Sequence, residues 1–245
     1  MKRKQVCGGI EMDLQELYNK HKRIVFFGGA GVSTESGIPD YRSKNGIYKQ
    51  GFKLPAETML SHSYFFSHTD DFYSFYRKVM VHPEAEPNDA HIKLAEMEKT
   101  KLISVITQNI DGLHQKAGSQ KVRELHGSIY RNHCIQCGKA YGLDAILETD
   151  GIPRCSCGGI IKPDVVLYEE SLDYDVLANA VDDISQADMM IVGGTSLNVY
   201  PAAGLLQYFH GDCVVIINLQ PTQYDRMATL TIERPIGEVF RELEL

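Results

Sequence analysis

The stretch Arg23-Ile-Val-Phe-Phe-Gly-Gly-Ala-Gly-Val-Ser-Thr-Glu-Ser-Gly37 decides the fold class, because it joins an apolar run to a glycine-rich loop. An apolar run of this length that ends on glycines indicates a buried strand leading straight into a turn. Glycines at such a turn let the backbone approach a ligand closely, so that amide N–H groups can hold a pyrophosphate. An ordinary glycine turn is the alternative, and a bare Gly-x-Gly pattern does not exclude it.

The rest of the chain repeats this alternation. Further short apolar runs lie at residues 102–106, 189–192 and 213–217, and another short segment spans residues 122–125. Apolar side chains at helical spacing occur at residues 90–99 and 175–187. Strands that alternate with helices predict an α/β fold with a Rossmann-like parallel sheet and helices on both faces. We expect this nucleotide-binding domain to comprise residues 1–44, 88–128 and 163–245.

Two segments interrupt the alternation. Residues 45–87 are rich in Phe, Tyr, His and Ser, and they predict a small helical insertion. Residues 129–162 contain four of the six cysteines and several glycines. We expect the two segments to form one smaller domain beside the sheet, with a cleft at the junction.

The cysteines are spaced as two pairs, Cys134-x-x-Cys137 and Cys155-x-Cys157. Paired cysteines at this separation predict a zinc-ribbon-like segment, in which four thiolates surround one zinc ion. A site closed by four thiolates has no open position, so the zinc would be structural. The second pair is one residue shorter than usual, and free reduced thiols are the alternative.

Composition narrows the function classes. The chain has 245 residues and a formal net charge of −7, which argues against a general binder of nucleic acids or anionic membranes. A zinc-ribbon nucleic-acid module ranks low, because few basic side chains flank the cysteines and no row of aromatic residues accompanies them. Residues 1–15 hold no apolar run long enough for a secretion signal, and no stretch approaches a membrane span. We therefore expect a cytoplasmic location.

Polar side chains follow several of the predicted strands. They occur in Thr107-Gln-Asn-Ile-Asp111, at His126 after residues 122–125, at Thr195 and Ser196, and at Asn218. Because the carboxyl ends of parallel strands meet at one edge of a sheet, we expect these groups to share one ligand site. The pattern differs from that of a dehydrogenase. Thr34 replaces the third glycine of the loop, and no strand ending in Asp or Glu follows where the ribose would be held.

Taken in order, these motifs resemble those of the sirtuin family of NAD-dependent protein lysine deacylases. The resemblance runs from about residue 24 to residue 240 and includes Gly29 to Arg42, Thr107 to Asp111, Leu125-His-Gly127, the four cysteines and Gly194-Thr-Ser-Leu197. It implies a protein lysine deacetylase that transfers the acetyl group to ADP-ribose and releases nicotinamide. NAD would be the co-substrate, acetylated lysine peptides or proteins the partners, and zinc a structural ion. An ADP-ribosyltransferase, a deacylase for longer neutral acyl groups and a non-catalytic NAD sensor are alternatives on the same fold.

The resemblance also implies a role for each matched position. His126 would be the general base, and Asn109 and Asp111 would share the catalytic site. The NAD-binding residues would be Ala30, Thr34, Tyr41, Arg42, Gln108, Asn109, Ile110, Asp111, His126, Thr195, Ser196, Asn218, Leu219 and Ile236. The substrate peptide would add as a strand beside Val166, Tyr168 and Val199.

Three positions depart from the family pattern. Tyr41 stands where Phe is usual, the Cys155-x-Cys157 spacing is short, and Glu169 replaces a frequent Gly, which would bias the enzyme toward basic peptides. Family members that remove acidic acyl groups carry a Tyr followed three residues later by an Arg in the helical insertion. Here Tyr73 is followed by Tyr76, and Arg77 lies one position further, about 100° around a helix. The acyl pocket is therefore expected to be uncharged and suited to acetyl.

Overall fold

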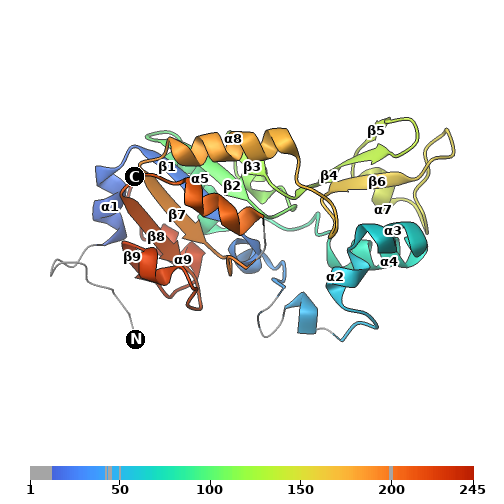
Figure 1. Cartoon of the computed structure of the whole chain (residues 1–245), viewed down its shortest axis with the longest axis horizontal. Helices are drawn as coiled ribbons and strands as arrows, with labels where there is room; N and C mark the ends of the chain where they lie inside the picture. Colours follow the sequence, from blue (N-terminus) through green and yellow to red (C-terminus); the bar gives the residue numbers. More distant parts are fainter. Residues whose placement is uncertain (1–12, 42, 44–45, 50, 199–200) are drawn as a thin grey trace.

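The computed structural model describes residues 13–41, 43, 46–49, 51–198 and 201–245. Figure 1 shows two parts side by side along the long axis, one built on the larger sheet and one on the smaller sheet. Within the described residues, no helix is long and apolar enough to cross a membrane.

The larger part is a parallel sheet of six strands, which confirms the predicted Rossmann-like fold. All the apolar runs named above form strands in it. In spatial order the strands are β3 (Val122–Glu124), β2 (Leu102–Thr107), β1 (Arg23–Gly28), β7 (Met189–Gly193), β8 (Cys213–Ile217) and β9 (Leu230–Ile232).

Helices cover both faces of this sheet because alternate side chains of each strand point to opposite faces. Ile24 and Phe26 of β1 pack in one apolar cluster, and Val25 and Phe27 pack in another. Each fully buried Phe stabilises the fold by about 1.5–3 kcal/mol. The first cluster includes side chains of α1 (Leu14–Lys20), α5 (Asp89–Met97) and α9 (Ile236–Arg241). The second includes α8 (Tyr174–Ser185) and η4 (Ala202–Tyr208).

The smaller part contains an antiparallel sheet in the order β5-β4-β6. Its strands are β4 (Gly127–Cys134), β5 (Ala140–Tyr141) and β6 (Ile161–Val165), and α7 (Asp144–Leu147) lies between the last two in sequence. The helical insertion supplies η3 (Ile47–Lys49), α2 (Ala56–Met59), α3 (His62–Ser67) and α4 (Thr69–Val79). A single apolar cluster joins the two segments, since it includes Phe65 and Tyr76 from the helices and Ile129 and Ile161 from the strands. The domain limits given above remain a prediction.

Candidate functional site

The glycine-rich loop packs directly against the loop that follows β7. The loop continues from β1 into η1 (Ala30–Val32) and η2 (Thr34–Ser36). The Gly29 and Gly31 amides donate to the Gly193 and Gly194 carbonyls at 3.3 and 2.8 Å. A Cβ on Gly31 would lie 2.8 Å from Gly194 Cα, so glycine is required where the two backbones meet. These two amides hold the loops together.

Ser33, Asn109 and Asp111 form a buried hydrogen-bonded group at the carboxyl ends of β1 and β2. The Asn109 amide donates to Ser33 Oγ at 2.9 Å, and Ser33 Oγ donates to Asp111 Oδ2 at 2.6 Å. The Leu113 amide donates to the other carboxylate oxygen at 3.0 Å. Burial raises the pKa of Asp111, while the hydrogen bonds from Ser33, Leu113 and Asn109 lower it in part. The group fixes two of the predicted catalytic side chains relative to the glycine-rich loop.

Gln108 connects three segments at this edge. Its amide N–H donates to the Gly28 carbonyl at 3.0 Å, and its side chain donates to Thr195 Oγ1 at 3.1 Å. Its carbonyl lies 2.9 Å from His126 Nδ1. A carbonyl only accepts, so Nδ1 carries the proton and the neutral ring keeps Nε2 as its basic atom. Burial lowers the pKa of His126, and the hydrogen bond to Gln108 opposes this in part.

The loop after β7 and the end of β8 are held together by a side-chain amide. Asn218 Oδ1 accepts from the Thr195 amide, and Asn218 Nδ2 donates to the Thr195 carbonyl, both at 3.0 Å. Ser196 and Leu219 are exposed beside this pair, with Leu219 67% exposed. Ile236, at the start of α9, is buried, and its side chain would collide with a Cβ on Gly193. The predicted adenosine residues thus lie at the carboxyl ends of neighbouring strands.

Of the remaining predicted NAD residues, some lie in the glycine-rich loop and others pack against the smaller part of the molecule. Ala30 and Thr34 are partly buried in the glycine-rich loop, where Thr34 Oγ1 donates to the Gly31 carbonyl at 2.9 Å. Tyr41 and Ile110 pack against the apolar cluster of the smaller part. Arg42 and Val199 lie outside the described residues.

The sequence reasoning missed three side chains that support the glycine-rich loop. Besides Ser33, Asn88 donates to the Val32 carbonyl and to Ser36 Oγ, at 2.7 and 3.0 Å. The Glu35 carboxylate accepts from the Gly237 amide in α9 at 2.7 Å. Ser33 and Glu35 lie within the quoted motif, while Asn88 carried only the signal of a helix cap, which it also is.

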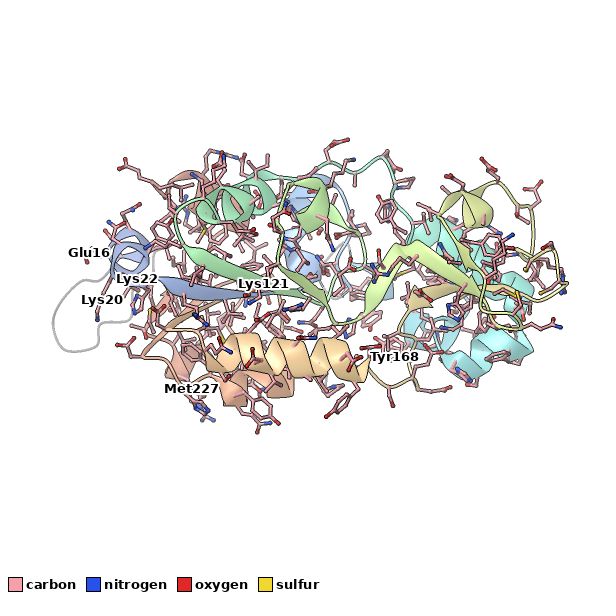
Figure 2. The ribbon with its side chains drawn as sticks, turned by 90° about the horizontal axis from the view of Figure 1, so that it is seen from above. Glu16, Lys20, Lys22, Lys121, Tyr168 and Met227 are labelled. Atoms are coloured by element: carbon pink, nitrogen blue, oxygen red, sulfur yellow. The ribbon has the colours of Figure 1, made fainter. Side chains whose placement is uncertain are left out.

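The predicted peptide-docking segment follows β6 and runs between the two parts. The Val166 amide donates to the His126 carbonyl at 3.0 Å, which places this segment beside the predicted base. Tyr168 forms an isolated parallel bridge with Ser61, and its hydroxyl lies 2.8 Å from that of Tyr48. Tyr168 is 38% exposed, and Figure 2 shows it beyond the end of α8, toward the smaller part.

Glu169 adopts a left-handed backbone with φ of 75°, which explains why glycine suits this position. Its carboxylate accepts hydrogen bonds from the Ser63 amide and hydroxyl in the first turn of α3, at 2.7 to 2.9 Å. These bonds lower the pKa of Glu169 and keep its charge at the surface. The carboxylate of the neighbouring Glu170 instead contacts the side chains of Lys162 and His62.

The four predicted cysteines converge. Their sulfur atoms all lie within 4.8 Å of one another, with 3.5 Å between Cys134 and Cys157 and 3.6 Å between Cys137 and Cys155. A tetrahedral zinc with Zn–S bonds of about 2.3 Å requires sulfur separations of about 3.8 Å. The short second pair lies in a tight turn, because the Gly158 amide donates to the Cys155 carbonyl at 2.9 Å. The arrangement is consistent with a structural zinc and fits no catalytic one.

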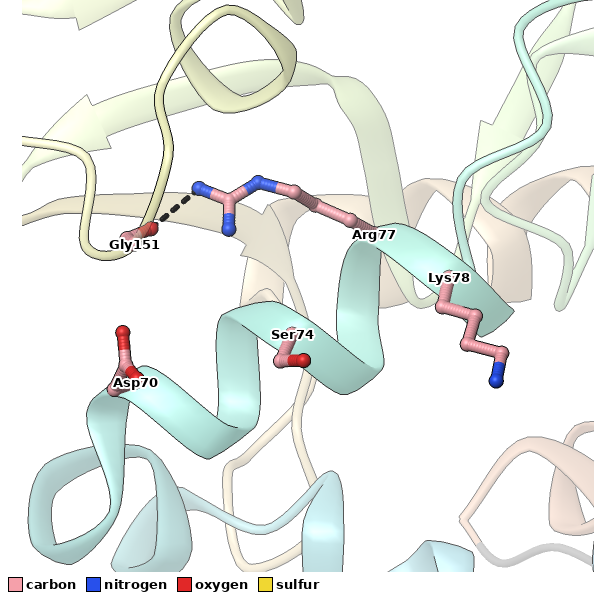
Figure 3. A pocket seen from close by; sticks show the side chains of 5 residues that line it. All are labelled: Asp70, Ser74, Arg77, Lys78 and Gly151. Atoms are coloured by element: carbon pink, nitrogen blue, oxygen red, sulfur yellow. Dashed lines mark hydrogen bonds between the residues drawn. The ribbon is translucent and has the colours of Figure 1, made fainter.

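Arg77 turns toward the cysteine-bearing segment. Its guanidinium donates to the Ile146 and Gly151 carbonyls at 2.7 and 2.5 Å, as Figure 3 shows for Gly151. A cavity of about 470 Å³ opens beside it, lined by Asp70, Ser74, Arg77, Lys78 and Gly151. A second cavity, of about 260 Å³, includes Arg23 and Leu102 at the amino ends of β1 and β2. Neither cavity contains a predicted NAD residue, and the predicted cleft remains a prediction.

Comparisons with known proteins agree on one family. A profile described as "Sir2 family" matches residues 29–201. An NAD-dependent protein deacetylase of Clostridium acetobutylicum is 55% identical over 232 residues, which cover 93% of this chain and 95% of the relative. One of Cutibacterium acnes is 55% identical over 223 residues, with 90% and 91% covered.

Solved structures that resemble this chain belong to the same family. A Sir2 variant with a deacetylated p53 peptide and 3'-O-acetyl ADP-ribose is 41% identical, with a TM-score of 0.86 and with 93% of this chain and 94% of that chain covered. A Sir2 bound to an acetylated peptide is 37% identical, with a TM-score of 0.81 and coverage of 94% and 96%.

Proposed function

Because this chain belongs to the Sir2 family and is an NAD-dependent protein deacetylase, we propose that His126 is the general base of the reaction. In that reaction the acyl oxygen of the substrate lysine bonds to ribose C1′ as the bond from C1′ to nicotinamide breaks. A ribose hydroxyl then loses its proton and attacks the bound acyl carbon. Addition of water and departure of the lysine amine leave the acyl group on ADP-ribose.

The hydrogen bond between His126 Nδ1 and the Gln108 carbonyl carries this proposal. It fixes the tautomer with a basic Nε2 and orients the ring at the carboxyl edge of the sheet. Burial lowers the pKa of His126, which favours the neutral ring that can accept a proton.

We assign Asn109 and Asp111 to the ribose and nicotinamide half of NAD. Ser33 holds both side chains in place before substrate binds, which reduces the entropy lost when NAD is oriented. A buried carboxylate also favours the positive charge that develops on the ribose as nicotinamide leaves. Ala30, Thr34, Tyr41, Arg42, Gln108 and Ile110 complete this half of the proposed site.

We assign Thr195, Ser196, Asn218, Leu219 and Ile236 to the adenosine half. The Thr195–Asn218 pair fixes the two loops relative to each other, and the exposed Leu219 offers an apolar surface to the adenine ring. The acetylated peptide adds beside Val166, Tyr168 and Val199, in the segment next to His126. Sir2 structures of this fold hold acetylated or deacetylated peptides. The cytoplasmic location belongs to the same proposal.

Release of nicotinamide from NAD, dependent on an acetylated peptide, tests the function. His126→Ala is expected to lower kcat about 10²–10⁴-fold, the usual contribution of a general base, while NAD binding and the thermal midpoint stay near those of the wild type. Full activity in this variant would remove His126 from the mechanism. Transfer of ADP-ribose to the peptide instead of acetyl to ADP-ribose would identify an ADP-ribosyltransferase.

A further inference from the structure

The proposed peptide-docking segment ends in a tight turn that Glu170 closes. The Glu170 amide donates to the Leu167 carbonyl at 3.0 Å. Glu169 occupies the third position of this four-residue turn with φ of 75°, a conformation that favours glycine. A non-glycine residue keeps such a conformation only where its surroundings support it. The Glu170 side chain gives that support, because its carboxylate accepts from the Leu167 amide at 2.9 Å.

Two elements of the smaller part hold the Glu170 carboxylate. Lys162 in β6 reaches its Oε2 at 3.1 Å, and Nδ1 of His62 in α3 lies 2.9 Å from its Oε1. The Lys162 amine also lies 3.4 and 3.3 Å from the Pro163 and Val165 carbonyls, just before the segment. The side chains of Lys162 and Glu170 are 12% and 20% exposed, so solvent screens their ion pair little. The pair therefore fixes the turn to the sheet of the smaller part.

The turn lies close to the residues that the peptide has to pair with. The Val166 amide donates to the carbonyl of the proposed base, His126, at 3.0 Å. Two residues further on, the Tyr168 carbonyl accepts from the His62 amide at 2.9 Å. The segment is thus held by backbone hydrogen bonds from Val166 to Tyr168 and by the side chain of Glu170 at its end. Movement of this turn would displace the edge to which a peptide strand adds.

We infer that Glu170 is a positioning residue for substrate peptides, and that its ion pair with Lys162 holds the docking segment in the extended form to which a peptide strand adds. This inference rests on the proposed function. A peptide that adds to a preformed edge loses less conformational entropy than one that has to order the edge as it binds. None of the contacts described for the Glu170 side chain involves a proposed NAD residue. Its loss therefore weakens peptide binding and leaves NAD binding unchanged.

The test measures nicotinamide release with one acetyl-lysine peptide, varying the peptide and NAD in turn. Glu170→Ala is expected to raise the KM for the peptide about tenfold, the loss expected for one hydrogen bond to a charged group, and to leave kcat and the KM for NAD unchanged. Glu170→Gln keeps an oxygen that accepts from the Leu167 amide, so its rise should be smaller, about threefold. Lys162→Met is expected to raise the KM for the peptide as well. Because the two side chains act as a pair, the double variant should be no worse than the worse single variant.

Asp183→Ala is the matched control. The Asp183 side chain is 3% exposed and is held by Lys121 and Arg123, and it lines the cavity at the amino ends of β1 and β2, at the opposite edge of the sheet from the proposed site. Both alanine variants remove a carboxylate that two basic side chains hold, so both are expected to lower the thermal midpoint. Asp183→Ala should leave the KM for the peptide unchanged.

An unchanged KM for the peptide in Glu170→Ala, an equal rise in the KM for NAD, or the same rise in Asp183→Ala would overturn the inference. If Glu170→Ala does not fold, Glu170→Gln and Lys162→Met decide by the same criteria. If the wild type releases no nicotinamide with the acetylated peptide, the proposed function itself fails. An active wild type whose Glu170 variants bind the peptide normally refutes the inference alone.

Discussion

Replacing Ser33 with alanine removes the central member of the Ser33–Asn109–Asp111 group. Ser33 is 1% exposed, and its hydroxyl donates to the Asp111 carboxylate at 2.6 Å. A hydrogen bond to a charged group contributes about 1.5–3 kcal/mol. Its loss acts mainly on the ionised carboxylate, so the pKa of Asp111 rises further above its usual range.

The sign of the pH dependence follows from this shift. Burial already raises the folded-state pKa of Asp111 above its unfolded value, so ionisation of this carboxylate opposes folding as pH rises. Ser33→Ala raises the folded-state pKa further. The loss of unfolding free energy is therefore largest at neutral pH, above the folded-state pKa, and becomes smaller as pH falls below it. If activity needs the ionised carboxylate, the acid limb of kcat/KM moves to higher pH.

Ser119→Ala is the matched control. Ser119 is also buried, but its hydroxyl has no hydrogen-bond partner among the described residues. Chemical denaturation at neutral and acidic pH, together with the pH profile of kcat/KM, separates the two variants. If both lose the same stability at both pH values and neither acid limb moves, the hydrogen bond to Asp111 does not act as described here.

Three further predictions follow from the smaller part of the molecule. Purified protein is expected to hold one zinc per chain, so a chelator is expected to lower its thermal midpoint. Cys155→Ser should lose the metal, whereas Cys213→Ser, the control, should keep it. Purified protein with four free thiols and no metal would contradict the zinc site. Acetyl-lysine is expected to be a better substrate than succinyl-lysine on one peptide, because Arg77 is held by two backbone carbonyls; a preference for succinyl would show that a cation reaches the acyl chain. At low salt, Glu169→Gln is expected to lower kcat/KM more for a peptide whose substrate lysine is flanked by lysines than for one flanked by glutamates. An equal change for both peptides would show that Glu169 contacts Ser63 but does not select the peptide charge.

Most of the large sheet could be predicted from the sequence because β1, β2, β7 and β8 are largely apolar runs, whereas β3 and β9 are short and partly polar. Such runs identify buried parallel strands, and the polar residues after them mark the carboxyl edge. The strand register then explains why those residues meet, since Gly28 pairs with Thr107 on one side and with Gly193 on the other. The cysteine site could be predicted more directly, because the sequence spacing within each cysteine pair keeps the two thiols close enough to bind one metal ion.

The contacts between loops could not be predicted in this way. No periodicity indicates that the Gly31 amide donates to the Gly194 carbonyl, because 163 residues separate them and only the sheet brings them together. The same holds for Asn88, whose local role as a helix cap hides its contact with Val32. The left-handed backbone at Glu169 was also hidden, because Glu rarely adopts it.

The groups that cost stability lie close to the proposed chemistry. Burial raises the pKa of Asp111 and lowers that of His126, so both charged forms are disfavoured where β2 and β3 end. The core of the large sheet is mostly apolar, although His91 and His114 are buried beside it and have ring nitrogens without a partner among the described residues. Natural sequences depart from local optimality chiefly where function requires it. Stabilising substitutions in the sheet core should therefore leave catalysis intact, whereas those that neutralise Asp111 should stabilise the protein and reduce its activity.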